Sequence, residues 1–146
     1  MPWDMGRGVV WSNGLILVAA AAAAPHPVWV LYVLCGLVSF LYHCHCENSF
    51  GGLDQIVSTT VVVVNVYLAA TMYSDHPLWT SAALLCGLSS IILYSVAINE
   101  DKHTKHYAKW HTLWHLGGGL TSALLWAPRL LDDREGGARE SKVNKK

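Results

Sequence analysis

Charged residues are absent from four long stretches of this chain, and this distribution constrains its fold more than any other feature. No Asp, Glu, Lys or Arg occurs in residues 8–46, 55–74, 76–99 or 110–128. Apolar segments of about 17–25 residues can cross the roughly 30 Å hydrocarbon core of a bilayer. A water-soluble domain of 146 residues would need more than 14% charged residues on its surface. We therefore expect an integral membrane protein with an all-α fold.

Prolines and charges divide the chain into five expected membrane spans. The first stretch is too long for one crossing, and Pro25 and Pro27 divide it because proline lacks a backbone donor and restricts the residue before it. The spans are expected at about residues 9–24, 28–45, 55–73, 78–98 and 109–126. Residues 1–128 thus form one membrane domain, and the polar residues 129–146 form a tail that we expect to be mostly disordered in water.

The composition argues against several classes of function. Lys+Arg and Asp+Glu both number 10, and no basic stripe supplies the phosphate neutralisation on which nucleic-acid binding depends. No glycine-rich nucleotide-binding motif occurs in the sequence. Cys35 and Cys86 fall inside expected spans, which argues against a secreted disulfide framework.

Polar residues gather at the ends of three expected spans. Ser39 and His43 lie four residues apart at the end of the second span, Asp54 opens the third, and His111 and His115 open the fifth. A four-residue spacing places two side chains on one helical face. Because consecutive spans alternate in direction, His43, Asp54, His111 and His115 all fall in the same leaflet. Ionisable groups at such positions are candidates for function, since a bilayer provides no water to solvate them.

These residue types favour a zinc site. Three neutral imidazoles with an open fourth position form a ligand set of catalytic zinc, which lowers the pKa of water towards about 7. His43, His111 and His115 are the expected ligands. Asp54 can accept a proton from the water or orient a histidine, and Ser39 can donate a hydrogen bond to a substrate carbonyl.

Other readings of the polar residues stay open. A lone histidine in a membrane more often packs through one hydrogen bond than binds a metal. Cys44, His45 and Cys46 compete as ligands because thiolates also suit zinc. Residues 117–119 are three glycines, which we interpret as a close helix contact. The remaining histidines are expected in loops: His26, His76, His103 and His106.

The ordered motifs resemble the CREST superfamily of membrane hydrolases. That group includes alkaline ceramidases, progestin and adipoQ receptors, proteins that remodel glycosylphosphatidylinositol (GPI) lipids, and the myomaker-like proteins. The resemblance rests on Ser39-xxx-His43, on Asp54, and on His111-Thr-Leu-Trp-His115, and is closest to the myomaker-like branch. It implies zinc held by the three histidines, with Asp54 and Ser39 assisting, and hydrolysis of an amide or ester bond in a membrane lipid such as a ceramide or a GPI lipid.

The sequence departs from this family in two ways. The family has seven spans, and this chain has room for five, so two helices between the Asp54 span and the last span are missing. Loss of a pair preserves the orientation of the motifs but removes walls of the lipid pocket. The stretch from His43 to Glu47 is also one residue longer than the myomaker-like pattern, which makes the assignment of its ligand histidine less specific.

Three functions are therefore considered. The first is a zinc-dependent lipid hydrolase. The second is a catalytically degenerate relative that acts as a structural subunit of a larger membrane complex, whose other subunits complete the missing helices. The third is a haem-binding bundle, since paired histidines on facing helices can ligate haem iron.

The distribution of basic residues predicts the orientation of the chain. Six Lys and Arg residues lie on the C-terminal side of the expected spans and four on the N-terminal side. The positive-inside tendency then places the C-terminus in the cytosol and the histidines towards the lumen or exterior, in an endomembrane or plasma membrane.

Overall fold

The computed structural model describes residues 12–24, 26–45, 48–100 and 104–143, without the side chains of residues 45, 48–50 and 133–143. These ranges contain helices and no strands. The helices are α2 (Gly14–Ala23), α3 (Val28–His45), α4 (Asn48–Met72), α5 (Pro77–Ala97) and α6 (Lys105–Val143). The expected all-α fold is therefore confirmed.

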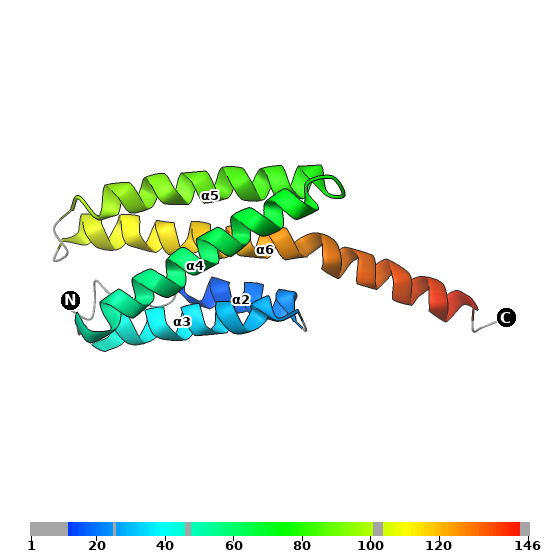
Figure 1. Ribbon diagram of the computed structural model, residues 1–146, viewed down its shortest axis with the longest axis horizontal. Helices are drawn as coiled ribbons and strands as arrows, with labels where there is room; N and C mark the ends of the chain where they lie inside the picture. The colour runs from blue at the N-terminus through cyan, green and yellow to red at the C-terminus, as the bar shows by residue number, and fades with distance from the viewer. Residues whose placement is uncertain (1–11, 25, 46–47, 101–103, 144–146) are drawn as a thin grey trace.

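The helices run up and down, so that successive turns lie at opposite ends of a bundle (Figure 1). The α3–α4 turn and the beginning of α6 lie at one end, and the α2–α3 and α4–α5 turns lie at the other. We call the first end the histidine end, because it carries His43, His111 and His115. In this topology α2 and α6 run in the same direction, and α6 continues beyond the bundle towards the C-terminus.

Prolines mark two helix boundaries, of which the one at Pro25 and Pro27 was expected from the sequence. Ala24, which precedes Pro25, is extended with φ −67° and ψ 141°, because a following proline disfavours helical backbone. Pro77 occupies the first turn of α5, where its missing N–H removes no helical hydrogen bond. The spans expected at 28–45 and 78–98 agree with α3 and α5 to within one residue.

The other helix ends differ from the expected spans. Helix α4 begins at Asn48 rather than at residue 55, because hydropathy does not detect a polar first turn that is nevertheless helical. The first span, expected over 9–24, is described as helix α2 only from Gly14. Its 10 residues rise by about 15 Å, which is half of a bilayer core.

Small residues allow α6 to pack closely against α5 and α2. A side-chain carbon at Gly117 would collide with the Ser90 hydroxyl of α5, and one at Gly119 would lie 2.9 Å from Leu15 Cβ of α2. These contacts confirm the predicted close helix packing for two of the three glycines. A Cβ at Gly118 would meet nothing within 4 Å, and Gly118 and Gly119 both border a cavity.

A buried polar network joins α3, α4 and α6 within the bundle. The Tyr32 hydroxyl donates to Asn65 Oδ1 at 2.7 Å, and Asn65 Nδ2 donates to Ser122 Oγ at 2.9 Å. Trp126 Nε1 donates to the Tyr32 hydroxyl at 3.2 Å. Each bond joins two different helices, so the network fixes how these helices sit relative to one another.

Two of the described helices are long and apolar enough to cross a bilayer, namely α4 over Gly51–Met72 and α5 over Pro77–Ala97. Five spans were expected, but α2 and the apolar part of α3 (Val28–Cys44) are shorter, and α6 is not among the helices that are both long and apolar enough. More large hydrophobic side chains are exposed than buried among the described residues, and Tyr67 and Leu78 are 67% and 78% exposed. Such an outer surface favours contact with lipid.

The C-terminal segment differs from the disordered tail expected at 129–146. Helix α6 passes through Pro128 and continues to Val143. The segment after Pro128 is rich in Leu, Arg and Glu, which are good helix formers. Because a helix already formed in the bundle avoids a new nucleation step, its extension into this segment needs only favourable propagation.

Candidate metal centre

Three histidines from two helices converge at the histidine end of the bundle. His43 lies in the last turn of α3, and His111 and His115 lie near the beginning of α6. The four-residue spacing places His111 and His115 one turn apart on the same face of α6. The up-and-down topology returns α6 to the end where α3 finishes (Figure 1). Residues 68 and 72 positions apart in the chain thereby come into contact.

Two of the three separations between the imidazole nitrogens match those between ligands of one ion. His43 Nε2 lies 3.3 Å from His111 Nε2 and 3.2 Å from His115 Nε2. One ligand atom from each of the three rings lies within 4.8 Å of the other two. Two nitrogens that each bind a tetrahedral zinc at about 2.0–2.1 Å are about 3.3 Å apart. The cluster can therefore hold a metal ion.

The same distances also suit hydrogen bonds between neutral imidazoles, but a single hydrogen bond does not account for both contacts of His43. A ring nitrogen carries either one N–H or one in-plane lone pair. That single group cannot point at His111 and His115 together, whereas a central cation accepts one lone pair from each ring. The donor set of three neutral imidazoles is one that zinc commonly uses.

Aromatic side chains hold the three rings in place. The Tyr107 ring stacks on His111 with centroids 4.9 Å apart and planes inclined by 28°. The Trp114 ring lies 4.6 Å from the ring of His115. His43 and His111 are buried. Ligands that are buried and packed in this way are preorganised, because few other rotamers are open to them.

Ser39 and Asp54, the other two expected site residues, lie buried together on α3 and α4. They are 2% and 7% exposed. The serine hydroxyl lies close enough to the Asp54 carboxyl to interact with it, but neither Ser39 Oγ nor Asp54 Oδ1 makes a hydrogen bond of ordinary geometry to a described residue. Ser39 lies one turn before His43 on α3. Two buried polar groups with unused hydrogen-bonding capacity thus lie near the histidine end.

The competing ligands do not join this cluster among the residues that the structure describes. Cys44 is half-buried and lies outside it. The side chain of His45 and the whole of Cys46 are not within the described residues. His106 is exposed and lies in the first turn of α6 rather than in a loop, because this helix begins at Lys105. His103 falls outside the described ranges.

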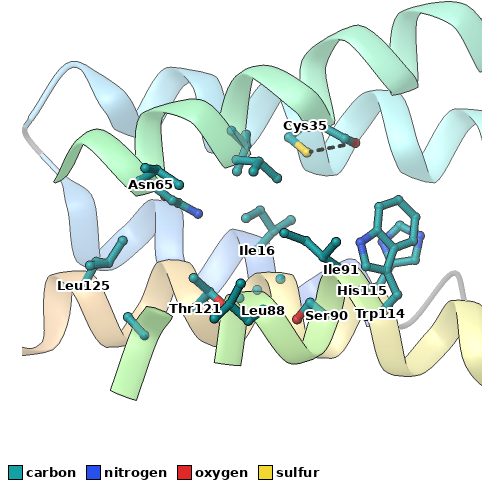
Figure 2. Close-up of a pocket in the computed structure, with 18 of the residues that line it drawn as sticks. Ile16, Cys35, Asn65, Leu88, Ser90, Ile91, Trp114, His115, Thr121 and Leu125 are labelled. Carbon is teal, nitrogen blue, oxygen red and sulfur yellow. Dashed lines mark hydrogen bonds between the residues drawn. The ribbon is translucent and has the colours of Figure 1, made fainter. Parts of the chain in front are cut away.

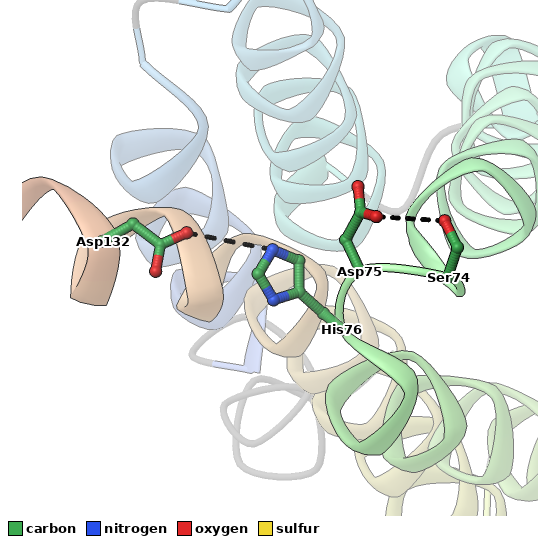
Figure 3. Close-up of polar contacts among 4 residues, drawn as sticks. All are labelled: Ser74, Asp75, His76 and Asp132. Atoms are coloured by element: carbon green, nitrogen blue, oxygen red, sulfur yellow. Dashed lines mark hydrogen bonds and ion pairs between the residues drawn. The ribbon is translucent and has the colours of Figure 1, made fainter.

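His26 and His76 lie in connecting turns at the opposite end of the bundle, as expected. The His26 ring packs 5.0 Å from the Trp126 ring. His76 Nε2 lies 3.9 Å from Asp132 Oδ2 of α6, and the neighbouring Ser74 donates to Asp75 Oδ1 (Figure 3). Both histidines contact residues within α6, at the end of the bundle opposite the three-histidine cluster.

An apolar cavity of about 150 Å³ begins beside His115. Figure 2 shows Trp114 and His115 at one end of this cavity and Leu125 at the other. The ten residues from His115 to Leu125 rise by about 15 Å along α6. The cavity opens between α4 and α5, because Val62 and Leu88 line it and are also 43% and 60% exposed. An alkyl chain can enter there from the side of the bundle.

Two asparagines were missed by the sequence analysis. Asn65 belongs to the buried network, and Asn13 is buried beside α2; both line the cavity. Each asparagine interrupts an apolar stretch. The principle that polar groups inside a membrane span are candidates for function would have identified both, but it was applied only to ionisable and hydroxyl side chains.

Comparisons with known protein families, curated proteins and solved structures found no match.

Proposed function

We propose that this protein is a zinc-dependent hydrolase of the CREST type, which cleaves an amide or ester bond of a membrane lipid. The observation that carries the proposal is the spacing of the His43, His111 and His115 nitrogens. Separations of 3.2 and 3.3 Å from one ring to the other two are those expected around a tetrahedral ion. The motif resemblance supplies the reaction class, and the cavity beside His115 supports a lipid substrate.

Each residue has a definite role in this reaction. Zinc, when bound, supplies Lewis-acid chemistry that activates water near neutral pH. The Asp54 carboxyl takes up a proton from the attacking water and returns it to the leaving amine or alkoxide. The Ser39 hydroxyl donates to the substrate carbonyl or orients the Asp54 carboxyl. Their unused hydrogen-bonding capacity supports these roles.

The cavity supports a substrate with an alkyl chain. Its apolar walls and its opening between α4 and α5 suit a chain that extends from the bilayer, with the scissile bond next to His115. Transfer of an alkyl chain from water into an apolar cavity is favourable by about 0.8 kcal/mol for each methylene. Transfer from lipid is much less favourable, because lipid tails are already apolar. Recognition therefore depends on the polar linkage rather than on the chain.

The proposal includes five membrane spans with the C-terminus in the cytosol. Helices α4 and α5 supply two spans by length and composition. Helix α3 has 18 residues and rises by about 27 Å, close to the thickness of a bilayer core. The apolar surface of the bundle supports lipid contact on its other sides as well.

A second candidate function is a structural subunit without activity. The opening of the cavity between α4 and α5 favours this alternative. Helices of neighbouring subunits would cover this opening in place of the two helices that the family has and this chain lacks. The third reading, a haem-binding bundle, is disfavoured because nitrogens that converge to 3.2–3.3 Å leave no room for a macrocycle between them.

Metal analysis of the purified protein tests the proposal. Full-length protein is purified in detergent without chelators, and its metal content is measured by mass spectrometry together with hydrolysis of a mixed lipid pool. The hydrolase predicts about one zinc per chain and release of fatty acid. Normally folded protein that binds no zinc would rule out the hydrolase and support the structural subunit, whereas a Soret band would support haem.

A further inference from the structure

Asn13 is a buried amide that the fold leaves without a hydrogen-bond partner. Its side chain is 5% exposed, and Nδ2 makes no hydrogen bond to any residue in the described part of the chain. Asn13 precedes α2 but does not cap it, since no hydrogen bond joins its side chain to the first turn. Burial of an unpaired amide donor is unfavourable, so its presence calls for an explanation outside folding.

Asn13 lies at nearly the same level of the bundle as His115. The backbone nitrogen of Ile16 lies 3.1 Å from the position of a Cβ at Gly119, and α2 and α6 run in the same direction (Figure 1). Counted back from this contact at 1.5 Å per residue, Asn13 lies about 4.5 Å and His115 about 6 Å closer to the histidine end. Both residues line the cavity.

Other polar groups of the cavity are engaged within the protein. Ser90 Oγ donates to the Cys86 carbonyl at 2.8 Å, and Thr121 Oγ1 donates to the Gly117 carbonyl at 2.8 Å. Asn65, the other asparagine in the cavity wall (Figure 2), uses its amide to bond Tyr32 and Ser122. Among the described residues that line this cavity, Asn13 Nδ2 is the buried donor for which the protein supplies no acceptor.

We infer that the Asn13 amide donates a hydrogen bond to the carbonyl oxygen of a ligand whose alkyl chain occupies the cavity. A carbonyl is the acceptor that amide and ester lipids carry, and the level of Asn13 places such a group next to His115. Asn13 is thus a specificity-determining residue. The choice of an amide or ester lipid rests on the proposed function, but recognition of a carbonyl does not.

Two fluorescent probes test this inference without any hydrolysis. The first is a long-chain ketone with a pyrene at its far end, which has a carbonyl but no cleavable bond. The second is the hydrocarbon of equal length with the same label. Full-length protein in lipid nanodiscs should bind the ketone about 3- to 10-fold more tightly, the effect of one neutral hydrogen bond. Asn13→Leu, similar in size, should abolish this preference and retain hydrocarbon binding.

Two further variants complete the test. Asn13→Asp replaces the amide donor with an acceptor and should also lose the preference. Asn99→Leu makes the same change at an exposed position at the end of α5 and should keep it. A ketone preference that persists in both Asn13 variants, or wild-type protein that does not distinguish the probes, would overturn the inference. In another outcome, the protein binds no zinc and hydrolyses no lipid, while the Asn13 variants still lose the ketone preference. That result would support the role of Asn13 and refute the hydrolase.

Discussion

His43 Nε2 lies 3.2 Å from His115 Nε2, although the two residues are separated by 72 positions in the chain. The contact depends on the two intervening helices, α4 and α5, which return α6 to the end of the bundle where α3 finishes. His111 Nε2 approaches the same His43 nitrogen at 3.3 Å. Any function that needs all three nitrogens therefore depends on the order of turns in the whole bundle.

Substitution of a single histidine should empty the metal centre. His43→Ala, His111→Ala or His115→Ala leaves two imidazoles, which cannot fix a tetrahedral site, so zinc affinity should fall more than about 100-fold. Metal content after gel filtration measures the loss. His106→Ala is the matched control, because His106 is exposed in the same helix. Full zinc content in all three cluster variants would show that the ion binds elsewhere.

Asp54→Asn should separate chemistry from metal binding. The amide keeps the shape of the carboxyl but cannot take up a proton, so lipid hydrolysis should fall by about 100-fold or more. Zinc should remain bound, with affinity reduced at most about 10- to 100-fold if Asp54 orients a ligand. Hydrolysis rates and metal content are measured on the same preparation. Undiminished hydrolysis would remove Asp54 from the reaction.

The neighbouring glycines of α6 should respond differently to the same small change. Gly119→Ala places a carbon 2.9 Å from Leu15 Cβ and 3.1 Å from a backbone nitrogen of α2, and such overpacking costs about 1–3 kcal/mol. Gly118→Ala meets nothing within 4 Å and should be neutral or slightly stabilising. Thermal unfolding in detergent compares the two variants. Equal unfolding temperatures would contradict the close contact of α2 with α6.

Asn65→Leu should destabilise the bundle, in contrast to Asn13→Leu. The change removes the acceptor of the Tyr32 hydroxyl and the donor to Ser122 Oγ, at a cost of about 1–3 kcal/mol. A double-mutant cycle with Tyr32→Phe, measured by unfolding in denaturant, isolates the bond between the two side chains. Strict additivity in that cycle would mean that the Tyr32–Asn65 bond contributes nothing to stability.

The orientation of the chain can be read by protease protection. Six basic residues beyond the last expected span and four on the other side place the C-terminus in the cytosol. Protease added to sealed vesicles with the cytosolic face outward should therefore remove an epitope placed after Lys146. An epitope that is protected until detergent opens the vesicles would reverse the orientation and turn the histidine end towards the cytosol.

The sequence by itself determined the helical class, the division of the first two helices at Pro25 and Pro27, and the residues of the three-histidine cluster. These features are local, because each depends on a few neighbouring residues. They are the length of an apolar stretch, the restricted backbone before proline, and the four-residue spacing that brings His111 and His115 to one face. Alternation of spans then predicted that His43 would share their end. The helical continuation of α6 to Val143 was not predicted, because composition alone does not account for a helix that is already nucleated.

Only the tertiary structure decided which polar groups meet and which are left without partners. Asn13 and Asn65 are the same residue type within apolar surroundings, yet Asn65 bonds to two other helices, whereas Asn13 Nδ2 has no partner in the described residues. Likewise, a Cβ at Gly117 or Gly119 would meet a neighbouring helix, and one at Gly118 would meet nothing within 4 Å. Such differences depend on the rotation and separation of packed helices, which side chains far apart in the sequence set together. No local pattern along the chain encodes them.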